Sequence, residues 1–325
     1  ASGSALFAVA DSAVGLAAAR ALIGLGFAGG LMAGVKAVVL WVHPSRHALA
    51  NACIMSVGGL GMLAATLPAE LAVQTIGWRA MFLWASIFTA LIAALIFFVV
   101  PEPDGDTTPA PLRQQLADIG TIYRDRFFWR LAPLVATTAG GHIGIHTLWA
   151  GPWFRDISGL DRDGVAWYLL LIGVAFLVGT LLGGIVADWL GRRGIDQMHV
   201  MVAGLGIFIV SQVGIVAEAT SLNLVIWTAF GMTGQMSILA YPALAKHFGM
   251  ARSARAQTSL NLLLFLTAFA SQSIIGAIID KYPQTATSYS PEGYRMAFGV
   301  MLVAQILAAV WYFAGHAKAV RTAND

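Results

Sequence analysis

The sequence is poor in charged residues and in cysteine. Asp, Glu, Lys and Arg together make up 11% of the 325 residues, against about 25% in an average soluble domain. Hydrophobic residues make up 58%, and the mean hydropathy is +0.76. A soluble chain of this length cannot bury so much apolar surface, so lipid is the solvent for most of it. The single cysteine, Cys53, excludes a disulfide within the chain.

Sequence patterns of enzymes and cofactor sites are also lacking. The chain has no phosphate-binding P-loop, no dinucleotide fingerprint and no Cys/His cluster with metal-ligand spacing. The net charge of +3 and the pI of about 9.2 are typical of basic loops at a membrane surface. We therefore expect no enzymatic activity, no metal or cofactor, and no nucleic-acid partner.

Long apolar runs fill most of the chain, and a helix needs about 20 such residues to cross a bilayer. The runs lack the alternation of barrel strands, so we expect an all-α, multi-pass helix bundle. The predicted spans cover residues 14–41, 48–73, 78–100, 130–152, 165–190, 197–217, 222–246, 256–279 and 294–315, and residues 1–11 resemble the end of another. The polar segment 101–129 predicts a linker, with a short amphipathic helix near Leu112–Tyr123, between residues 1–100 and a six-helix part, 130–325.

The positions of Lys and Arg predict the orientation of these spans. One set of predicted loops carries twelve of the nineteen basic residues, and the opposite set carries five. The remaining two, Arg20 and Lys36, fall inside a predicted span. We therefore expect the first set of loops and the C-terminus to be cytoplasmic, in a protein of the plasma membrane (the inner membrane of a bacterium).

One loop between two predicted spans combines glycine, aspartate and arginine. Gly184, Asp188, Gly191, Arg192 and Arg193 follow the spacing G-x-x-x-D-x-x-G-R-R. This spacing resembles the cytoplasmic loop signature of the major facilitator superfamily of secondary transporters, except that Trp189 replaces the usual basic residue. The resemblance implies conformational gating, and anchoring of the loop is the alternative. Because a helix C-terminus disfavours negative charge, we expect a neighbouring helix to supply a partner for Asp188.

A second pattern places an arginine inside a membrane span. Arg20, Gly24 and Gly26 resemble the R-x-x-x-G-x-G pattern on the fourth helix of the same family. A charge in lipid is costly, so Arg20 is expected to face the bundle interior. The resemblance implies proton or anion coupling, and bonds to backbone carbonyls are the alternative. Lys36 either contacts solute or extends to the membrane surface.

A weak internal repeat supports two related halves. Residues 20–41 align without gaps on residues 227–248, an offset of 207. Two similar halves joined by a polar linker are typical of this superfamily. The offset places the first-half counterpart of the signature loop before residue 1. We therefore expect about two and a half helices of the complete fold to be missing; a complete ten-helix protein is the alternative.

Two further groups are candidates for proton coupling. Glu70 is the acidic residue in the apolar part of a first-half span, on one predicted helical face with Met55, Gly59, Met62 and Thr66. A buried carboxylate there is suited to exchange a proton, whereas a hydrated Glu70 would not be.

The predicted helix 130–152 has a polar stripe in which His142, His146 and Trp149 recur at steps of three or four residues. The resemblance makes this the seventh helix, which lines the cavity. The two histidines then bind a solute carboxylate, transfer protons or hydrogen-bond a neighbouring helix. A metal site is not expected, because a third ligand is lacking. Further candidates for the cavity wall are Trp227, Gln235, Tyr241 and Asn261.

The resemblance implies secondary active transport of a small polar or anionic solute by alternating access, coupled to protons, in a monomer embedded in the lipid bilayer. Arg20, Lys36 and the two histidines favour a positive cavity. The first alternative is drug or amphiphile efflux by proton antiport, which an interior rich in Trp and Met would suit. A non-transporting membrane sensor or gene remnant is the second.

Overall fold

The computed structural model describes residues 1–43, 46–100, 112–285 and 288–324. These residues form helices joined by short turns, with one isolated β-bridge between Gln284 and Tyr289. The predicted all-α fold is therefore confirmed. The chain divides into two compact units, residues 1–108 and 109–325.

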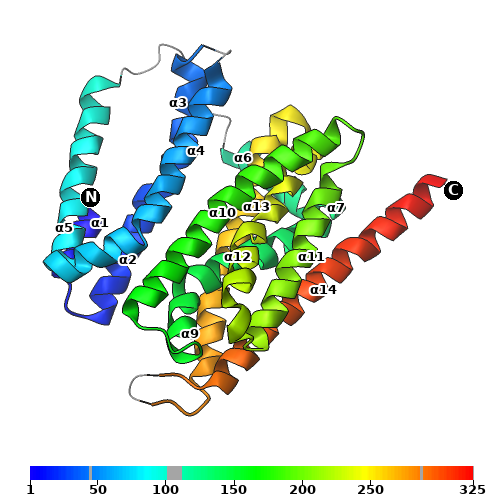
Figure 1. The fold of residues 1–325 in the computed structure, drawn as a ribbon. Helices are drawn as coiled ribbons and strands as arrows, with labels where there is room; N and C mark the ends of the chain where they lie inside the picture. The colour runs from blue at the N-terminus through cyan, green and yellow to red at the C-terminus, as the bar shows by residue number, and fades with distance from the viewer. Residues whose placement is uncertain (44–45, 101–111, 286–287, 325) are drawn as a thin grey trace. The chain divides into compact units, whose positions relative to one another are not determined.

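The described residues of the first unit form five helices, which Figure 1 labels. They are α1 (Ser2–Val9), α2 (Ala13–Phe27), α3 (Gly30–Trp41), α4 (His47–Ala64) and α5 (Leu67–Val99). Helix α1 packs against both α2 and α5. The hydroxyl of Ser12 caps α2 by accepting a hydrogen bond from the N–H of Gly15 at 3.0 Å. Helix α5 bends at Gly77, whose φ of 79° is a left-handed conformation suited to glycine.

The boundary between α4 and α5 differs from the sequence prediction. The expected span 48–73 ends at Ala64, and α5 begins at Leu67 with Pro68 in its first turn. Proline lacks an N–H and is tolerated in a first helical turn but not in a helix interior. Glu70 therefore lies on α5, beyond the break. The continuous helical face predicted for Glu70 and the α4 residues Met55, Gly59 and Met62 is wrong.

The second unit begins with α6 (Leu112–Arg124) and a long interrupted rod. The rod consists of α7 (Arg126–Val135), the π-helical segment η2 (Ala136–Gly140), α8 (Gly141–Gly144), a second π-helical segment η3 (Ile145–Trp149) and α9 (Ala150–Asp156). Segments of π-helix are rare and frequently occur at functional sites. The predicted His142 lies between the two segments, on α8, and the predicted His146 lies within η3.

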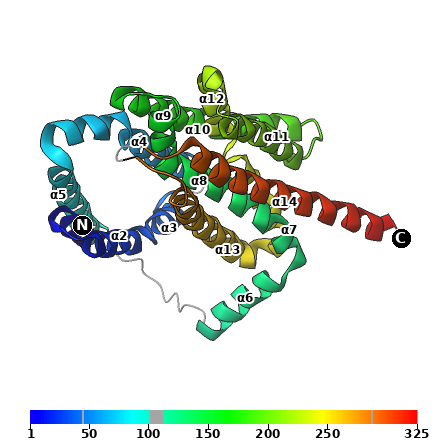
Figure 2. The same ribbon diagram turned by 90° about the horizontal axis from the view of Figure 1, so that it is seen from below.

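The remaining helices complete the second unit. They are α10 (Arg162–Gly191), α11 (Gln197–Val216), η4 (Thr220–Leu222), α12 (Asn223–Thr233), η5 (Met236–Leu239), α13 (Ala240–Ile279) and α14 (Pro291–Asn324). Helix α13 turns at Gly249, whose φ is 68°. Helix α10 packs on α12, α12 on α11, α11 on α14 and α14 on α13, and the rod packs on α10, α13 and α14 (Figure 2).

Six helical spans in the described residues are long and apolar enough to cross a membrane: Leu67–Val99, Arg162–Gly191, Gln197–Val216, Thr220–Gly249, Arg252–Ile279 and Pro291–Ala314. The fourth span runs from η4 through α12 and η5 into the first arm of α13, and the fifth is the second arm of α13. Two other expected spans are interrupted, residues 14–41 at Ala28–Gly29 and residues 130–152 by η2 and η3. Large apolar side chains remain exposed along these helices, including Phe97, Phe98 and Val210. Such a surface is matched to lipid rather than to water.

Candidate functional site

Arg20 lies on α2, exposed rather than facing an interior of this unit, and its guanidinium sits beside two aromatic rings. Its guanidinium carbon is 4.8 Å from the ring centre of Phe7 and 5.5 Å from that of Phe82. Those two rings are themselves in contact. Within the described residues no carboxylate forms an ion pair with Arg20. Aromatic faces attract a cation without neutralising it, so the arginine keeps a positive charge that an anion can approach.

Two other predicted residues of this unit have different outcomes. Glu70 is partly buried and accepts a hydrogen bond from the side-chain amide of Gln74 at 3.0 Å. This pair lies within the first turns of α5, next to the break after α4. Lys36 is on α3, but its side chain lies outside the described part of the structure.

The signature residues lie at the C-terminal end of α10: Gly184, Asp188 and Gly191 are in the helix, and Arg192 and Arg193 follow it. Asp188 pairs with Arg192 one turn later, with 2.8 Å between carboxylate oxygen and guanidinium nitrogen. Both side chains are mostly exposed, at 66% and 79%. Among the described residues, the cationic partner of Asp188 comes from the end of its own helix. The expectation that a neighbouring helix supplies this partner is therefore wrong. The i,i+4 spacing brings the arginine onto the same helical face and places its charge at the helix C-terminus, where a cation is favourable.

Trp189 stands where the family signature usually has a basic residue, and its ring contacts the side chain of another basic residue, Arg193. The guanidinium carbon of Arg193 lies 3.7 Å from the centre of the Trp189 ring. Beside the loop is a cavity of about 830 Å³, lined by Gly184, Asp188, Gly191 and Arg192 together with Pro242 and Lys246 of α13. Four of the five signature residues thus share a cavity with the first turns of α13, and Lys246 adds a cation that the sequence pattern did not single out.

His142 is buried in the core of the second unit. Its ring is 1% exposed and contacts Phe176, Phe208 and Phe230 at centroid distances of 6.0, 6.1 and 4.8 Å. Its Nδ1 atom is 3.5 Å from the amide nitrogen of Gln235, and its Nε2 atom has no hydrogen-bond partner among the described residues. The predicted Gln235 is therefore next to the predicted His142, within the bundle.

The carbonyl groups of η2 receive side-chain amides from other elements. Gln235 donates to the Ala139 carbonyl at 3.4 Å, and Gln305 of α14 donates to the Thr137 carbonyl at 3.3 Å. Gln212 of α11 in turn donates to the side chain of Gln305, and both glutamines are fully buried. Buried polar groups of this kind stabilise helix contacts. The sequence analysis missed Gln212 and Gln305, although two glutamines inside apolar spans were visible in the sequence.

Of the other predicted residues of the rod and α12, His146 is partly buried, whereas Trp149 and Trp227 are buried. The ring of His146 is 5.6 Å from that of His142 and is less buried. Trp149 is nearly buried and donates through its indole N–H to the Gln272 carbonyl at 3.0 Å. Trp227 is fully buried against Trp153. Trp227 is thus a core residue of the second unit rather than a residue on its surface.

Tyr241 and Asn261 lie together. The hydroxyl of Tyr241 donates to the side-chain oxygen of Asn261 at 2.9 Å. The two residues are on opposite sides of the turn at Gly249, so this bond joins the two arms of α13. The sequence predicted both residues but not their contact.

A buried carboxylate at the far end of the rod was also missed. The Asp156 side chain is 1% exposed, and Arg155 lies 2.6 Å from one of its oxygens. The Tyr294 hydroxyl and the Tyr289 backbone N–H donate to the other oxygen at 2.8 and 3.1 Å. A charge is rarely so buried without such partners. Asp156 thus ties the end of α9 to the start of α14.

Comparison with known proteins agrees with this class of membrane helix bundle. The family model of the Major Facilitator Superfamily matches residues 1–237. That stretch is most of the chain and includes α1 to α12. The chain belongs to the Major Facilitator Superfamily.

Relatives with assigned names match parts of the chain. The cis,cis-muconate transport protein of Acinetobacter baylyi is 30% identical over 144 residues, which are 41% of this chain and 34% of that protein. The probable sulfoacetate transporter SauU of Cupriavidus necator is 26% identical over 199 residues, which are 57% of this chain and 46% of that protein. The chain thus spans less than half the length of the curated relatives it matches.

The fold is also similar to solved structures. A bacterial homolog of the human lysosomal transporter Spinster, in an inward-facing, unoccupied conformation, superimposes with a TM-score of 0.70. The sequence identity is 16%, and the match covers 96% of this chain and 79% of that chain. The occupied, inward-facing form of the same protein gives a TM-score of 0.68 at 18% identity. This likeness shows the fold.

Proposed function

We propose that this protein is a secondary active transporter that moves a small organic anion across the membrane by alternating access. The observation that carries the anion preference is the position of Arg20, with its guanidinium beside the contacting rings of Phe7 and Phe82 and without a carboxylate partner in the described residues. An intramembrane cation of this kind requires a counter-charge. A solute carboxylate or sulfonate supplies one.

Two relatives support the same class of solute. Muconate is a dicarboxylate and sulfoacetate carries a carboxylate and a sulfonate, and these are the solutes in the names of two matching transporters. Arg20 binds such a group through charge-assisted hydrogen bonds from its planar fork, while the two aromatic rings hold the guanidinium from one side. In this proposal the arginine loses water on binding and regains it on release, which links occupancy to the state of the surrounding helices.

The signature loop has a gating role in this proposal. Asp188 and Arg192 are exposed at the end of α10, beside a cavity that Lys246 also lines. Lys246 offers Asp188 a second cationic partner. Exchange between the two partners would bias an equilibrium between conformations that solute binding then shifts.

The test is uptake into proteoliposomes containing the full chain, with radiolabelled cis,cis-muconate and sulfoacetate as probes. We expect uptake of at least one probe and a loss of at least tenfold in Arg20→Gln, about the value of one charge-assisted hydrogen bond. Arg79→Gln is the matched control, because Arg79 also contacts an aromatic ring but pairs with Asp11 near the end of the unit. Equal uptake by Arg20→Gln and wild type would contradict the proposal.

Proton coupling is a separate part of the proposal, and it rests on Glu70 and the histidine pair. If Glu70 carries the proton, an inward proton gradient will accelerate uptake by the wild type but not by Glu70→Gln. The corresponding variants His142→Gln and His146→Gln test the histidines. If all three variants keep the full response to the gradient, these residues do not couple transport to protons.

A further inference from the structure

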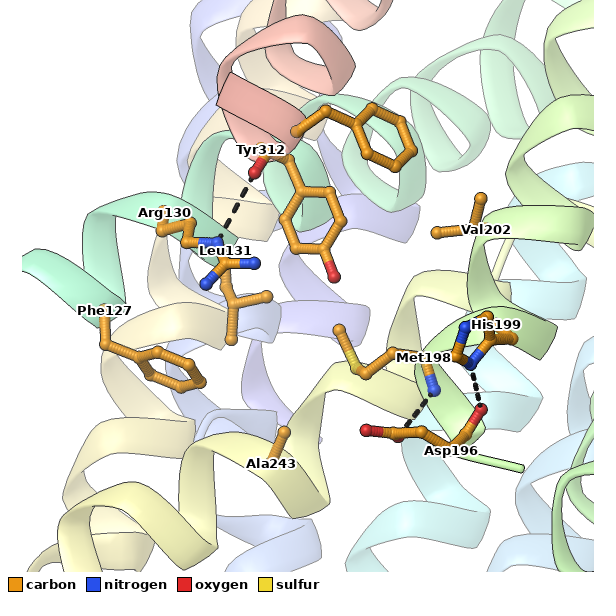
Figure 3. Close-up of a pocket in the computed structure, with 10 residues that line it drawn as sticks. Phe127, Arg130, Leu131, Asp196, Met198, His199, Val202, Ala243 and Tyr312 are labelled. Atoms are coloured by element: carbon orange, nitrogen blue, oxygen red, sulfur yellow. Dashed lines mark hydrogen bonds between the residues drawn. The ribbon is translucent and has the colours of Figure 1, made fainter. Parts of the chain in front are cut away.

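A pocket of about 420 Å³ lies at one end of the second unit, and the histidine pair does not line it (Figure 3). Its walls come from four elements: Phe127, Arg130 and Leu131 of α7, Asp196 with Met198, His199 and Val202 of α11, Ala243 of α13, and Tyr312 and Phe313 of α14. In Figure 3, Arg130 and Leu131 face Met198 and His199 across the pocket, with the Tyr312 ring between them. Its volume lies in the range of small-molecule sites.

The pocket lies where apolar helices meet the membrane surface. Arg130 is in the second turn of α7, His199 in the first turn of α11, and Tyr312 in the last turn of the apolar stretch of α14 that ends at Ala314. This is the level at which lipid headgroups contact a membrane protein. A ligand in the pocket therefore has one end in the headgroup region.

In the part of the chain that the structure describes, the pocket wall carries one cation, Arg130, together with Asp196 and His199. The Arg130 side chain lies over the Tyr312 ring at 5.1 Å and donates through Nε to the Tyr312 carbonyl at 3.4 Å, which holds the guanidinium at the pocket wall. His199 contacts the Asp196 carbonyl through Nδ1 at 3.2 Å, so its Nε2 atom is directed elsewhere. The Asp196 carboxylate also lines the pocket, but it caps the N-terminus of α11, where it accepts the Met198 N–H at 3.0 Å and the positive end of the helix dipole offsets part of its negative charge.

An apolar surface continues from the pocket toward the middle of the membrane. On α14, Phe313 is followed by Val310 and Ile306 on the same helical face, and these side chains are 46%, 59% and 40% exposed. On α11, Val202 is followed by Gly206, which has open space in front of its backbone. Helices α11 and α14 pack together, so both apolar rows lead away from the same pocket.

From this arrangement we infer that the pocket binds the headgroup of one anionic phospholipid, whose phosphate contacts Arg130 and whose acyl chains follow the exposed apolar row of α14. Basic pockets between membrane helices are suited to such headgroups. A soluble phosphate compound would use the charge but not the apolar row. The inference does not depend on which solute the protein transports.

The experiment is native mass spectrometry of the purified full chain with stepwise addition of dioleoyl phosphatidylglycerol or dioleoyl phosphatidylcholine. Both lipids carry the phosphate, but in phosphatidylcholine the choline cation offsets its charge next to Arg130. We therefore expect one phosphatidylglycerol to bind the wild type about tenfold more tightly than phosphatidylcholine, the value of one charge-assisted hydrogen bond in a half-buried site. Arg130→Gln should abolish this preference by removing the charge. Ala243→Leu should abolish it by filling the pocket, with every charge retained.

Arg124→Gln is the matched control, since Arg124 is an exposed cation just before α7 that does not line the pocket. It should retain the preference. Thermal unfolding of each lipid-free variant checks that it is folded. The inference is overturned by equal affinity of the wild type for both lipids, by an unchanged preference in Arg130→Gln or in Ala243→Leu, or by an equal loss in Arg124→Gln. Displacement of the lipid by millimolar glycerol phosphate also overturns it, because the ligand is then a soluble anion.

Discussion

The imidazole ring of His142 lies against the backbone of Gly234, so close that a Cβ atom on residue 234 would overlap the ring. Gly234→Ala should therefore destabilise the protein by about 1–3 kcal/mol, the usual cost of overpacking a core. Thermal and denaturant unfolding in detergent measure this change. Gly206→Ala is the control, because nothing lies within 4 Å of a Cβ atom there.

The same contact predicts a strong interaction between the two mutations. In a His142→Ala background the ring is absent, so Gly234→Ala should add little to the cost of the first substitution. A double-mutant cycle should give a coupling free energy of about 1 kcal/mol or more. If Gly234→Ala costs the same in both backgrounds, another neighbour limits the space.

Asp188→Asn separates gating from stability. The exposed i,i+4 pair with Arg192 should contribute at most about 0.5 kcal/mol to the free energy of unfolding. If the loop gates transport, uptake of the probe solutes should nevertheless fall by more than the about twofold change that this energy permits. Asp163→Asn, an exposed carboxylate at the opposite end of α10, should change neither quantity. Full transport by Asp188→Asn would restrict the loop to a topological role.

Asp125 predicts a dependence of stability on acid. Burial raises the pKa of Asp125, but its hydrogen bonds with His247, Phe128 and Phe127 outweigh burial, and the pKa is lowered below its ordinary value of 3.8. A lowered folded pKa stabilises the folded state above the ordinary value, and this stabilisation is lost as the pH falls through the lowered pKa. The difference in melting temperature between wild type and Asp125→Asn should therefore be full near pH 6 and shrink below pH 4. A difference that grows in acid would contradict this assignment.

Tyr294→Phe tests the buried Asp156. The substitution removes one donor from a carboxylate that is 1% exposed. A hydrogen bond to a buried charge contributes about 1.5–3 kcal/mol, and unfolding in detergent should show a loss of that size. Tyr282→Phe, at a half-buried tyrosine of the neighbouring turn, should cost less than about 0.5 kcal/mol. Equal small effects would mean that Arg155 and the Tyr289 N–H satisfy the carboxylate without Tyr294.

The helical class and most span positions could be predicted from the sequence, because apolar runs of about 20 residues form membrane-spanning helices and few other structures. The family was visible in the spacing of five residues around Asp188. Arg20 was also predictable, since an arginine among apolar residues needs a specific environment. Its two aromatic neighbours come from α1 and α5, however, and no local pattern links Phe7 to Phe82.

The burial of single polar residues could not be predicted in the same way. Hydropathy reports transfer out of water, but it does not separate lipid from protein interior. His142 and Trp227 have the spacing expected for a cavity wall, yet both are enclosed within the second unit. Likewise, the helix break before Glu70 arises because Pro68 lies in the first turn of α5. The helical periodicity of residues 55–70 in the sequence does not reveal this break.

The two π-helical segments make the length of the rod as important as its composition. Each residue of an α-helix turns the chain by about 100°, so deletion of one residue from η2 would rotate every later side chain of the rod by roughly that angle. His146, Trp149 and Asp156 would then all meet the wrong neighbours, even though no amino acid among them had changed. Among homologous sequences, residues 136–149 should therefore tolerate substitutions but rarely show insertions or deletions.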